Sequence, residues 1–300
     1  MTDGSGNYQF STLASGASYT VTPSKANRPT GSAGITTADI LAVQGHILLR
    51  TAFILTGCRL AAADVTQGGG VTTNDILGIQ AFILQRASGF GFTGQYRFTP
   101  PSRSYSPLSG NQTAQNYDAI VLGDTTSPFA NPRPGGPDPD APDAVGVSTV
   151  ASVALPDITV DPSKRNFTAA VKTSEIDANS NLVGFQGDIT FDERVITFES
   201  EPVQNAGLTA GNWNVSGNVL DGAGPIRTLR ISAYSNDFTA LSGSGTLFEL
   251  KMTHVSKAGQ STQLLWAAPP DQFIFIDADL NPQKPGNAAP GSVTPSRKPR

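Results

Sequence analysis

Apolar and polar residues alternate along the C-terminal half of the chain, over residues 183–191, 229–233 and 248–252. A period of two is the pattern of strands that bury one face. Clusters of Gly, Ser, Asn and Asp separate these segments and are typical of turns. With about eight or nine such strands between residues 147 and 279, the sequence predicts a two-sheet β-sandwich.

A helical period runs instead through residues 35–86. Within this segment, residues 34–49 align with residues 70–85 at an offset of 36, with nine identities in sixteen positions. Each copy begins with the capping-box pattern Thr-x-x-Asp and continues with an apolar stripe. The stripe residues are Ile40, Val43 and Ile47 in the first copy and Ile76, Ile79 and Ile83 in the second. We therefore expect two helices that pack on each other as a hairpin.

Short strand-like segments flank the helical repeat, at residues 7–23 and 95–121. The stretch NPRPGGPDPDAPDA has five Pro and three Asp in fourteen residues, which predicts an extended linker over residues 128–146. A second Pro-rich stretch, 281–300, lacks an apolar period and is predicted to be a C-terminal linker. The chain is thus expected to be mainly β, with one helical insert.

Charge and composition exclude several classes of function. Twenty basic and 24 acidic residues give a net charge of −4 without a basic run, so nucleic acid is not an expected partner. No apolar run is long enough for membrane insertion. The single cysteine, Cys58, excludes an internal disulfide and is expected to be a small buried residue. The N-terminus lacks the layout of a signal peptide, and we expect a piece of a longer exported protein, located outside the cell or on its surface.

The second repeat is preceded by a candidate calcium loop, DVTQGGGVTTND, at residues 64–75. It has Asp at position 1, Gly at position 6 and a carboxylate, here Asp, at position 12, which is the frame of an EF-hand loop of twelve residues. The candidate Ca²⁺ ligands are Asp64, Thr66, Gly70, Thr72 and Asp75. Two carboxylates predict weak binding. The first copy has Arg28 at position 1, and the positive charge predicts that no metal binds there.

The duplicated segment, about residues 27–92, resembles a type I dockerin, a calcium-loop module that docks onto cohesin domains. The resemblance implies that loop positions 10 and 11 contact the partner. These positions are Thr37 and Ala38 in the first copy and Thr73 and Asn74 in the second. The basic residues often found after the final Asp of such loops are absent here, where Gln44 and Gln80 stand instead.

The flanking strands resemble a carboxypeptidase-regulatory-like or collagen-adhesin B-type β module. The two matching parts are YTVTPSK, residues 19–25, and YRFTPPSRSYSPLSGNQT, residues 96–113. The helical repeat separates them, so we expect it to be inserted into one small β module made of residues 1–26 and 93–127. The alternative is a row of three consecutive small modules.

The C-terminal segment, residues 147–280, resembles a cohesin domain, a jelly-roll sandwich related in fold to carbohydrate-binding modules. The resemblance rests on residues 183–192, 229–234 and, most specifically, LSGSGTLFEL at 241–250. It implies that cohesin or dockerin modules, of other chains or of the same chain, are the partners.

No arrangement of side chains predicts catalysis. The carboxylates, among them Asp188 and Asp192, fall at strand ends and turns, where we expect solvated charges. The sequence therefore favours a non-catalytic protein that assembles modules or displays them, with a link to polysaccharide degradation. The alternatives are a sugar-binding sandwich, with Trp213 or Trp266 as stacking platform, and an inert stalk.

Overall fold

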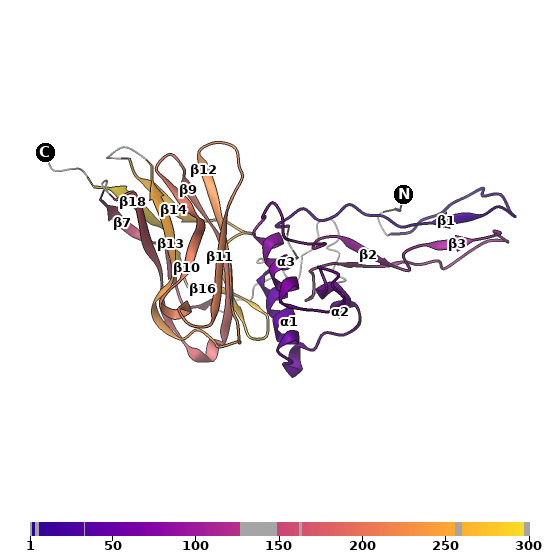
Figure 1. Cartoon of the computed structure of the whole chain (residues 1–300), viewed down its shortest axis with the longest axis horizontal. Coiled ribbons are helices and arrows are strands. Elements are labelled where there is room, and N and C mark those ends of the chain that lie inside the picture. Colours follow the sequence, from indigo (N-terminus) through magenta and orange to yellow (C-terminus); the bar gives the residue numbers. More distant parts are fainter. Residues whose placement is uncertain are drawn as a thin grey trace.

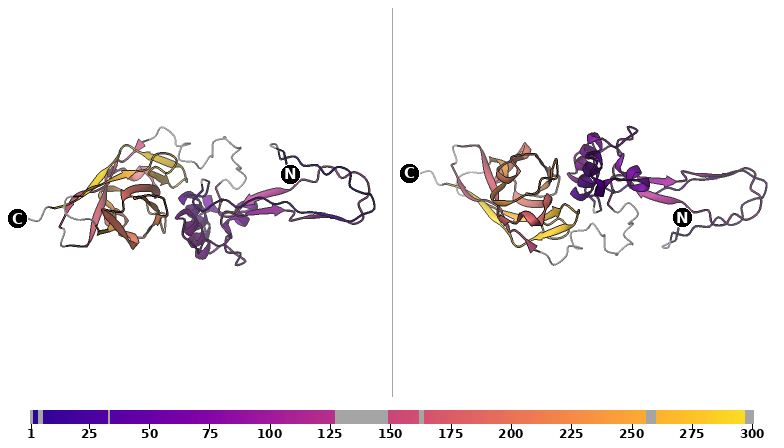
Figure 2. Two further views of the ribbon diagram at one scale, coloured as in Figure 1. Left: turned by 90° about the horizontal axis from the view of Figure 1, so that it is seen from above. Right: turned by 90° about the horizontal axis from the view of Figure 1, so that it is seen from below.

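The computed structural model describes residues 2–3, 6–32, 34–126, 149–161, 164–255 and 260–296. Figure 1 shows a β-sandwich at one end, a group of helices in the middle and a narrow ribbon of strands at the other end. The same order is visible in both views of Figure 2. The linker predicted over residues 128–146 lies outside the described residues, and no described helix is long and apolar enough to cross a membrane.

The narrow ribbon combines strands from both sides of the helical segment. β1 (Tyr19–Val21) pairs antiparallel with β3 (Arg103–Tyr105), and β2 (Tyr96–Thr99) pairs antiparallel with β4 (Asp118–Val121). A hydrogen bond between the Arg28 amide and the Gly94 carbonyl, 2.8 Å long, joins the two ends of the helical segment. The chain therefore leaves the ribbon, forms the helices and returns, although the proposed division into modules stays a prediction.

The two repeats form α1 (Thr37–Ile47) and α3 (Thr73–Ile83), which contact each other. Both predicted capping boxes are confirmed, because Asp39 and Asp75 each accept the backbone N–H of the Thr three residues earlier. The connection between the helices holds a short 3-10 turn, η1 (Thr51–Phe53), and a helix that the sequence did not predict, α2 (Gly57–Ala63). The predicted stripes lie in one apolar cluster between the helices.

The sandwich has two sheets, as predicted. One has the strand order β10-β13-β8-β6-β17, and the other has the order β5-β16-β15-β9-β14-β18-β7, with β12 paired to β9 and β11 paired to β12. The strands are β5 (Thr149–Val150), β6 (Val153–Ala154), β7 (Asp157–Val160), β8 (Asn166–Ile176), β9 (Leu182–Asp192), β10 (Ile196–Asn205), β11 (Trp213–Leu220), β12 (Ile226–Ser235), β13 (Gly243–His254), β14 (Thr262–Trp266), β15 (Ile274–Asp277), β16 (Pro282–Pro285), β17 (Ala288–Ala289) and β18 (Gly291–Pro295).

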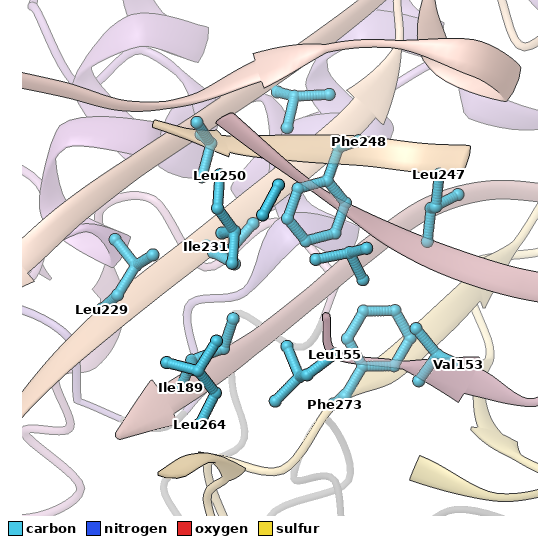
Figure 3. Close-up of a cluster of buried hydrophobic side chains, with 14 of the residues drawn as sticks. Val153, Leu155, Ile189, Leu229, Ile231, Leu247, Phe248, Leu250, Leu264 and Phe273 are labelled. Atoms are coloured by element: carbon cyan, nitrogen blue, oxygen red, sulfur yellow. The ribbon is translucent and has the colours of Figure 1, made fainter. Parts of the chain in front are cut away.

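The inward row of β9 fills the space between the sheets. Phe185 stacks on Phe248 of the opposite sheet, with ring centroids 5.5 Å apart, and on Trp213, at 5.9 Å. Figure 3 shows part of this core, including Ile189 of β9 and Leu250 of β13. The prediction that alternating residues of this strand face the core is therefore confirmed, and the residues between them face away from the core.

The C-terminal linker predicted over residues 281–300 is wrong for residues 282–295. Strands β16, β17 and β18 pair in parallel with β5, β6 and β7 and belong to the sandwich. The prolines that suggested a linker, Pro282, Pro285 and Pro295, are the end residues of β16 and β18. Proline is tolerated at strand ends and sheet edges, where its missing N–H leaves the rest of the ladder intact.

Candidate docking interface between the helices and the sandwich

The outward face of strands β15, β9, β12 and β11 forms a surface that the helices cover. Antiparallel register places Gly184, Gln186 and Asp188 of β9 opposite Tyr234, Ser232 and Arg230 of β12. The next strands add Ile276 and Ile274 of β15 on one side and Asn214 and Asn218 of β11 on the other. We call this set of residues the outer face. It is polar except at its β15 edge and near Tyr234.

The apolar part of the outer face packs on α1. Leu41 is fully buried and lies 3.0 Å from the point where a Cβ of Gly184 would stand, so the missing side chain makes room for it. Tyr234 and Ile276 share one buried cluster with Ile40 and Leu41. Removal of this apolar surface from water stabilises the contact of helix and sheet.

Polar groups of α1 bond to the same face. The Thr37 amide donates to Oε1 of Gln186 at 2.8 Å, and the Thr37 hydroxyl lies 2.9 Å from that of Ser232. Seven residues on, Nε2 of Gln44 donates to the Ser235 carbonyl at 3.0 Å. Thr37, Leu41 and Gln44 share one side of the helix because they are spaced four and three residues apart. The amide of Thr37 belongs to the first turn, where intrahelical acceptors are missing, so Gln186 satisfies a donor that would otherwise need water.

Helix α3 reaches the outer strand β11 through its last turns. Nε2 of Gln80 donates to Oδ1 of Asn214 at 2.9 Å, and Nδ2 of Asn218 donates to the Leu84 carbonyl at 2.8 Å. Leu84 is the C-cap residue of α3. Its carbonyl is among those that a helix leaves without an intrahelical partner, so the sandwich completes the end of this helix.

A third contact joins η1 to the segment after β12. The rings of Phe53 and Phe238 lie 5.1 Å apart, and the Arg50 guanidinium lies over the Phe238 ring at 4.4 Å. Phe53 itself rests on Gly45 of α1, where a Cβ would come within 2.6 Å of the Phe53 Cβ. Aromatic and cation–π contacts of this kind stabilise an interface beyond the area that they bury.

A buried ion pair lies at the end of the outer face. Arg230 donates from Nε and Nη2 to the two carboxylate oxygens of Asp188, at 2.9 and 2.8 Å, and from Nη2 to Asp271 at 2.7 Å. Its Nη1 donates to the Gly31 carbonyl of the first repeat loop at 3.2 Å. Burial raises the pKa of Asp188, and the bonds to Arg230 oppose that effect. The expectation that Asp188 is a solvated charge is wrong, since only 4% of it is exposed.

The four predicted partner-binding residues differ in exposure. Thr37 and Ala38 are buried, and Thr37 bonds to the outer face. Thr73 and Asn74, their counterparts in the second repeat, are exposed. The structure therefore brings Thr37 to the outer face and buries Ala38 in the apolar cluster, whereas the second pair lies in solvent. The repeat alone does not reveal this difference.

The candidate calcium ligands lie only partly together. Thr66 and Thr72 each donate a backbone N–H and a hydroxyl to Asp75, at distances of 2.8 to 3.1 Å. Asp64 accepts the Gly68 amide at 3.1 Å, and Gly70 is exposed. In the described part of the chain, no group of three or more His, Cys, Asp and Glu side chains is arranged to hold a metal. The donor set fits Ca²⁺ only in part, because both Asp75 oxygens already accept protein donors.

We predict that calcium binds the second loop weakly, with a Kd of about 0.1 to 1 mM, the range of low-affinity extracellular sites. The cation must turn the Thr66 and Thr72 hydroxyls away from Asp75 before these oxygens can coordinate it. Calorimetric titration of the intact chain measures the affinity, and Asp64→Asn is expected to remove the binding heat. Absence of heat at millimolar calcium would show that the loop is a turn without a metal.

In the first loop, protein donors surround the carboxylate at position 12. Oδ1 of Asp39 accepts the backbone amides of Thr125 and Thr126, at 2.7 and 3.0 Å, and Oδ2 accepts the Thr36 amide at 2.8 Å. Burial raises the pKa of Asp39, and the same amides oppose that effect. The segment that follows β4 therefore fixes the N-terminus of α1 in the position that it takes on the outer face.

The ionisation of the Tyr234 phenol at high pH reports on burial of the outer face. Burial raises the pKa of Tyr234 to about 12, so the folded protein favours the neutral phenol. The stabilisation is full below the ordinary tyrosine pKa of about 10 and is lost as pH rises through about 12. We predict that the 295 nm titration of the intact chain, minus that of Tyr234→Phe, shows one phenol that ionises near pH 12. Ionisation of that phenol near pH 10 would mean that water reaches it.

The two histidines are at least partly buried, and the single cysteine is exposed. His46 accepts the Leu55 amide at Nδ1, at 3.1 Å, and His254 is buried at the end of β13. Cys58 is exposed in the first turn of α2, so the expectation of a buried cysteine is wrong. Its neighbours Gly57 and Arg59 are exposed as well, because α2 buries only its last residues.

No protein-family model and no characterised protein sequence matches the chain. Among solved structures, the chain is similar to the sixth cohesin of scaffoldin B from Acetivibrio cellulolyticus, a structure solved in complex with a Cel5 dockerin mutant. The identity is 14% and the TM-score is 0.39, and the match covers 49% of this chain and 100% of that one. It is also similar to a non-cellulosomal cohesin from Archaeoglobus fulgidus, at 19% identity and a TM-score of 0.33, over 51% and 93% of the two chains. A cohesin module of a family 33 glycoside hydrolase from Clostridium perfringens matches at 11% identity and a TM-score of 0.36, over 50% and 100%.

Proposed function

We propose that the chain carries a docking pair, in which the sandwich binds the helical repeat of the same molecule through the outer face. The single observation that carries the proposal is Thr37, which bonds to both Gln186 and Ser232 across a separation of more than a hundred residues. The pair resembles a cohesin and a dockerin joined in one chain. Its role is protein–protein assembly without catalysis.

The composition of the contact supports recognition rather than simple burial. Leu41 and Tyr234 form the apolar centre of the contact. At the two ends of the covered surface, Gln44 and Asn218 donate directional hydrogen bonds across it. A core with a polar, bonded rim is the usual construction of a specific protein interface. Each of these polar groups would bond to water in a separated pair, so the bonds add specificity more than affinity.

The sugar-binding alternative has less support. Trp213, one candidate platform, is buried in the sandwich core against Phe185. Trp266 packs on Phe273, with ring centroids 4.8 Å apart. Stacking on a sugar ring needs an exposed aromatic face, and these contacts occupy the tryptophan rings. Location outside the cell and a link to polysaccharide degradation remain parts of the proposal, which the resemblance to exported modules suggests.

The proposal is tested by cutting the intact chain between the two partners. A protease site placed in the Pro- and Asp-rich stretch 131–144 allows cleavage after folding, without separate expression of either half. We expect the two fragments to elute together in size-exclusion chromatography at micromolar concentration. Separation of the fragments under native conditions would reject docking.

A further inference from the structure

The repeat has a nearly twofold internal symmetry, so either copy presents similar groups to the outer face. Thr37, Leu41 and Gln44 of the first copy correspond to Thr73, Leu77 and Gln80 of the second, with identical residue types. Thr37 and Leu41 are buried under the sandwich, whereas Thr73 is exposed and Leu77 is 50% exposed. Gln44 bonds to the Ser235 carbonyl of β12, and Gln80 bonds instead to Asn214 of the edge strand β11. The side chains of these three pairs therefore do not explain why the first copy is chosen.

We infer that Gly31, together with Gly45 and Phe53, selects the first repeat for docking. This inference rests on the proposed docking function. At these three positions the second copy has Gln67, Ala81 and Gly89. In the reverse orientation, the second repeat would lie on the outer face in place of the first. The differences at Gly45 and Phe53 favour the observed orientation by adding a contact, and the difference at Gly31 blocks the reverse orientation.

Gly31 provides the block. Its carbonyl accepts Nη1 of Arg230, and a Cβ at this position would stand 2.6 Å from that nitrogen and 2.4 Å from Nε2 of Gln85 in the helical segment. Arg230 is held by Asp188 and Asp271 and has little freedom to move away. The counterpart in the second loop, Gln67, has a full side chain there, so the second loop does not fit against Arg230. Specificity commonly uses such a repulsive element.

Gly45 and Phe53 provide the attraction. Phe53 reaches Phe238 of the sandwich because Gly45 leaves the surface of α1 open beneath it. In the second copy, Ala81 fills the place of Gly45, and Gly89 has no side chain to offer to the sandwich. The second repeat therefore lacks the aromatic contact in the reverse orientation.

The first test exchanges Gly31 for the residue of the second loop. Gly31 and Gln67 both have positive φ, 71° and 53°, so the loop backbone accepts glutamine at position 31. Gly31→Gln and its control are made in a Gln85→Ala background, because the new Cβ would otherwise also meet the Gln85 side chain, at 2.4 Å. We expect the Thr37 amide, protected in the intact wild-type protein by its bond to Gln186, to exchange with deuterium about tenfold faster or more. The matched control is Gly57→Gln, at a glycine of φ 55° with nothing within 4 Å of its Cβ position, and it should leave Thr37 protected.

A second variant, Gly45→Ala, separates docking from helix stability. Alanine favours a helix more than glycine does, so α1 itself should gain stability. We nevertheless expect faster exchange at Thr37, because the new Cβ displaces Phe53 from Phe238. Undiminished Thr37 protection in Gly31→Gln, or equal loss in Gly57→Gln, would overturn the inference. Failure of this inference can be told apart from failure of docking itself, because docking is tested separately by the elution of the cleaved wild-type fragments.

Discussion

Leu41→Ala should weaken the complex of the two cleaved fragments by roughly 30-fold to more than 1000-fold. Leu41 is fully buried beside Gly184, and truncation of a buried leucine costs about 2 to 5 kcal/mol through lost apolar contact and the remaining cavity. The dissociation constant is measured by dilution of the cleaved chain with a fluorescent label on the exposed Cys58.

The internal repeat supplies the matched control. Leu77→Ala makes the same chemical change at the equivalent position of α3, where the side chain is half exposed. Its effect should stay within about 0.5 kcal/mol, as for surface substitutions in general. Circular dichroism at 222 nm checks that both variants keep their helices. Equal effects of the two substitutions would mean that the outer face does not distinguish α1 from α3.

Asp188→Asn should lower the melting temperature of the sandwich by roughly 6 to 20 °C. The substitution leaves the Arg230 guanidinium buried without its main counter-charge, and breaking a buried pair in this way costs about 3 to 5 kcal/mol. Asp271 still bonds to Arg230, which favours the lower end of this range. The change is measured by calorimetry on the intact chain.

Asp192→Asn is the control on the same strand. Asp192 pairs with Arg194, whose side chain is 69% exposed, and an ion pair in water contributes little. The melting temperature of this variant should therefore match that of the wild type. A drop as large as that of Asp188→Asn would contradict the role given to burial.

Local sequence patterns predicted the elements but not their partners. The capping boxes of Thr36 and Thr72 depend on residues three positions apart, and the inward row around Phe185 depends on a period of two, so both could be recognised in one short window. The repeat and its two helices follow from the same kind of local information.

Contacts between distant segments are not visible in local sequence patterns. Asp188 lies in a strand whose outward residues are polar, and polar outward residues ordinarily face water. The local pattern therefore does not indicate its buried pairing with Arg230 next to the first repeat loop. In the same way, nothing near Pro282 indicates that β5 would pair with that segment from more than a hundred residues away. Long-range pairing is decided by the whole fold and leaves little trace in a local pattern.

The most direct measurement of docking is a disulfide between helix and sheet in the intact chain. The hydroxyls of Thr37 and Ser232 lie 2.9 Å apart, so cysteines at these positions should approach within bonding reach. With Cys58→Ala as background, Thr37→Cys combined with Ser232→Cys should form an intramolecular disulfide on mild oxidation, seen as a mass loss of two hydrogens. The pair Thr73→Cys with Ser232→Cys should remain reduced. Oxidation of the second pair but not of the first, or of neither, would contradict docking of the first repeat on the sandwich.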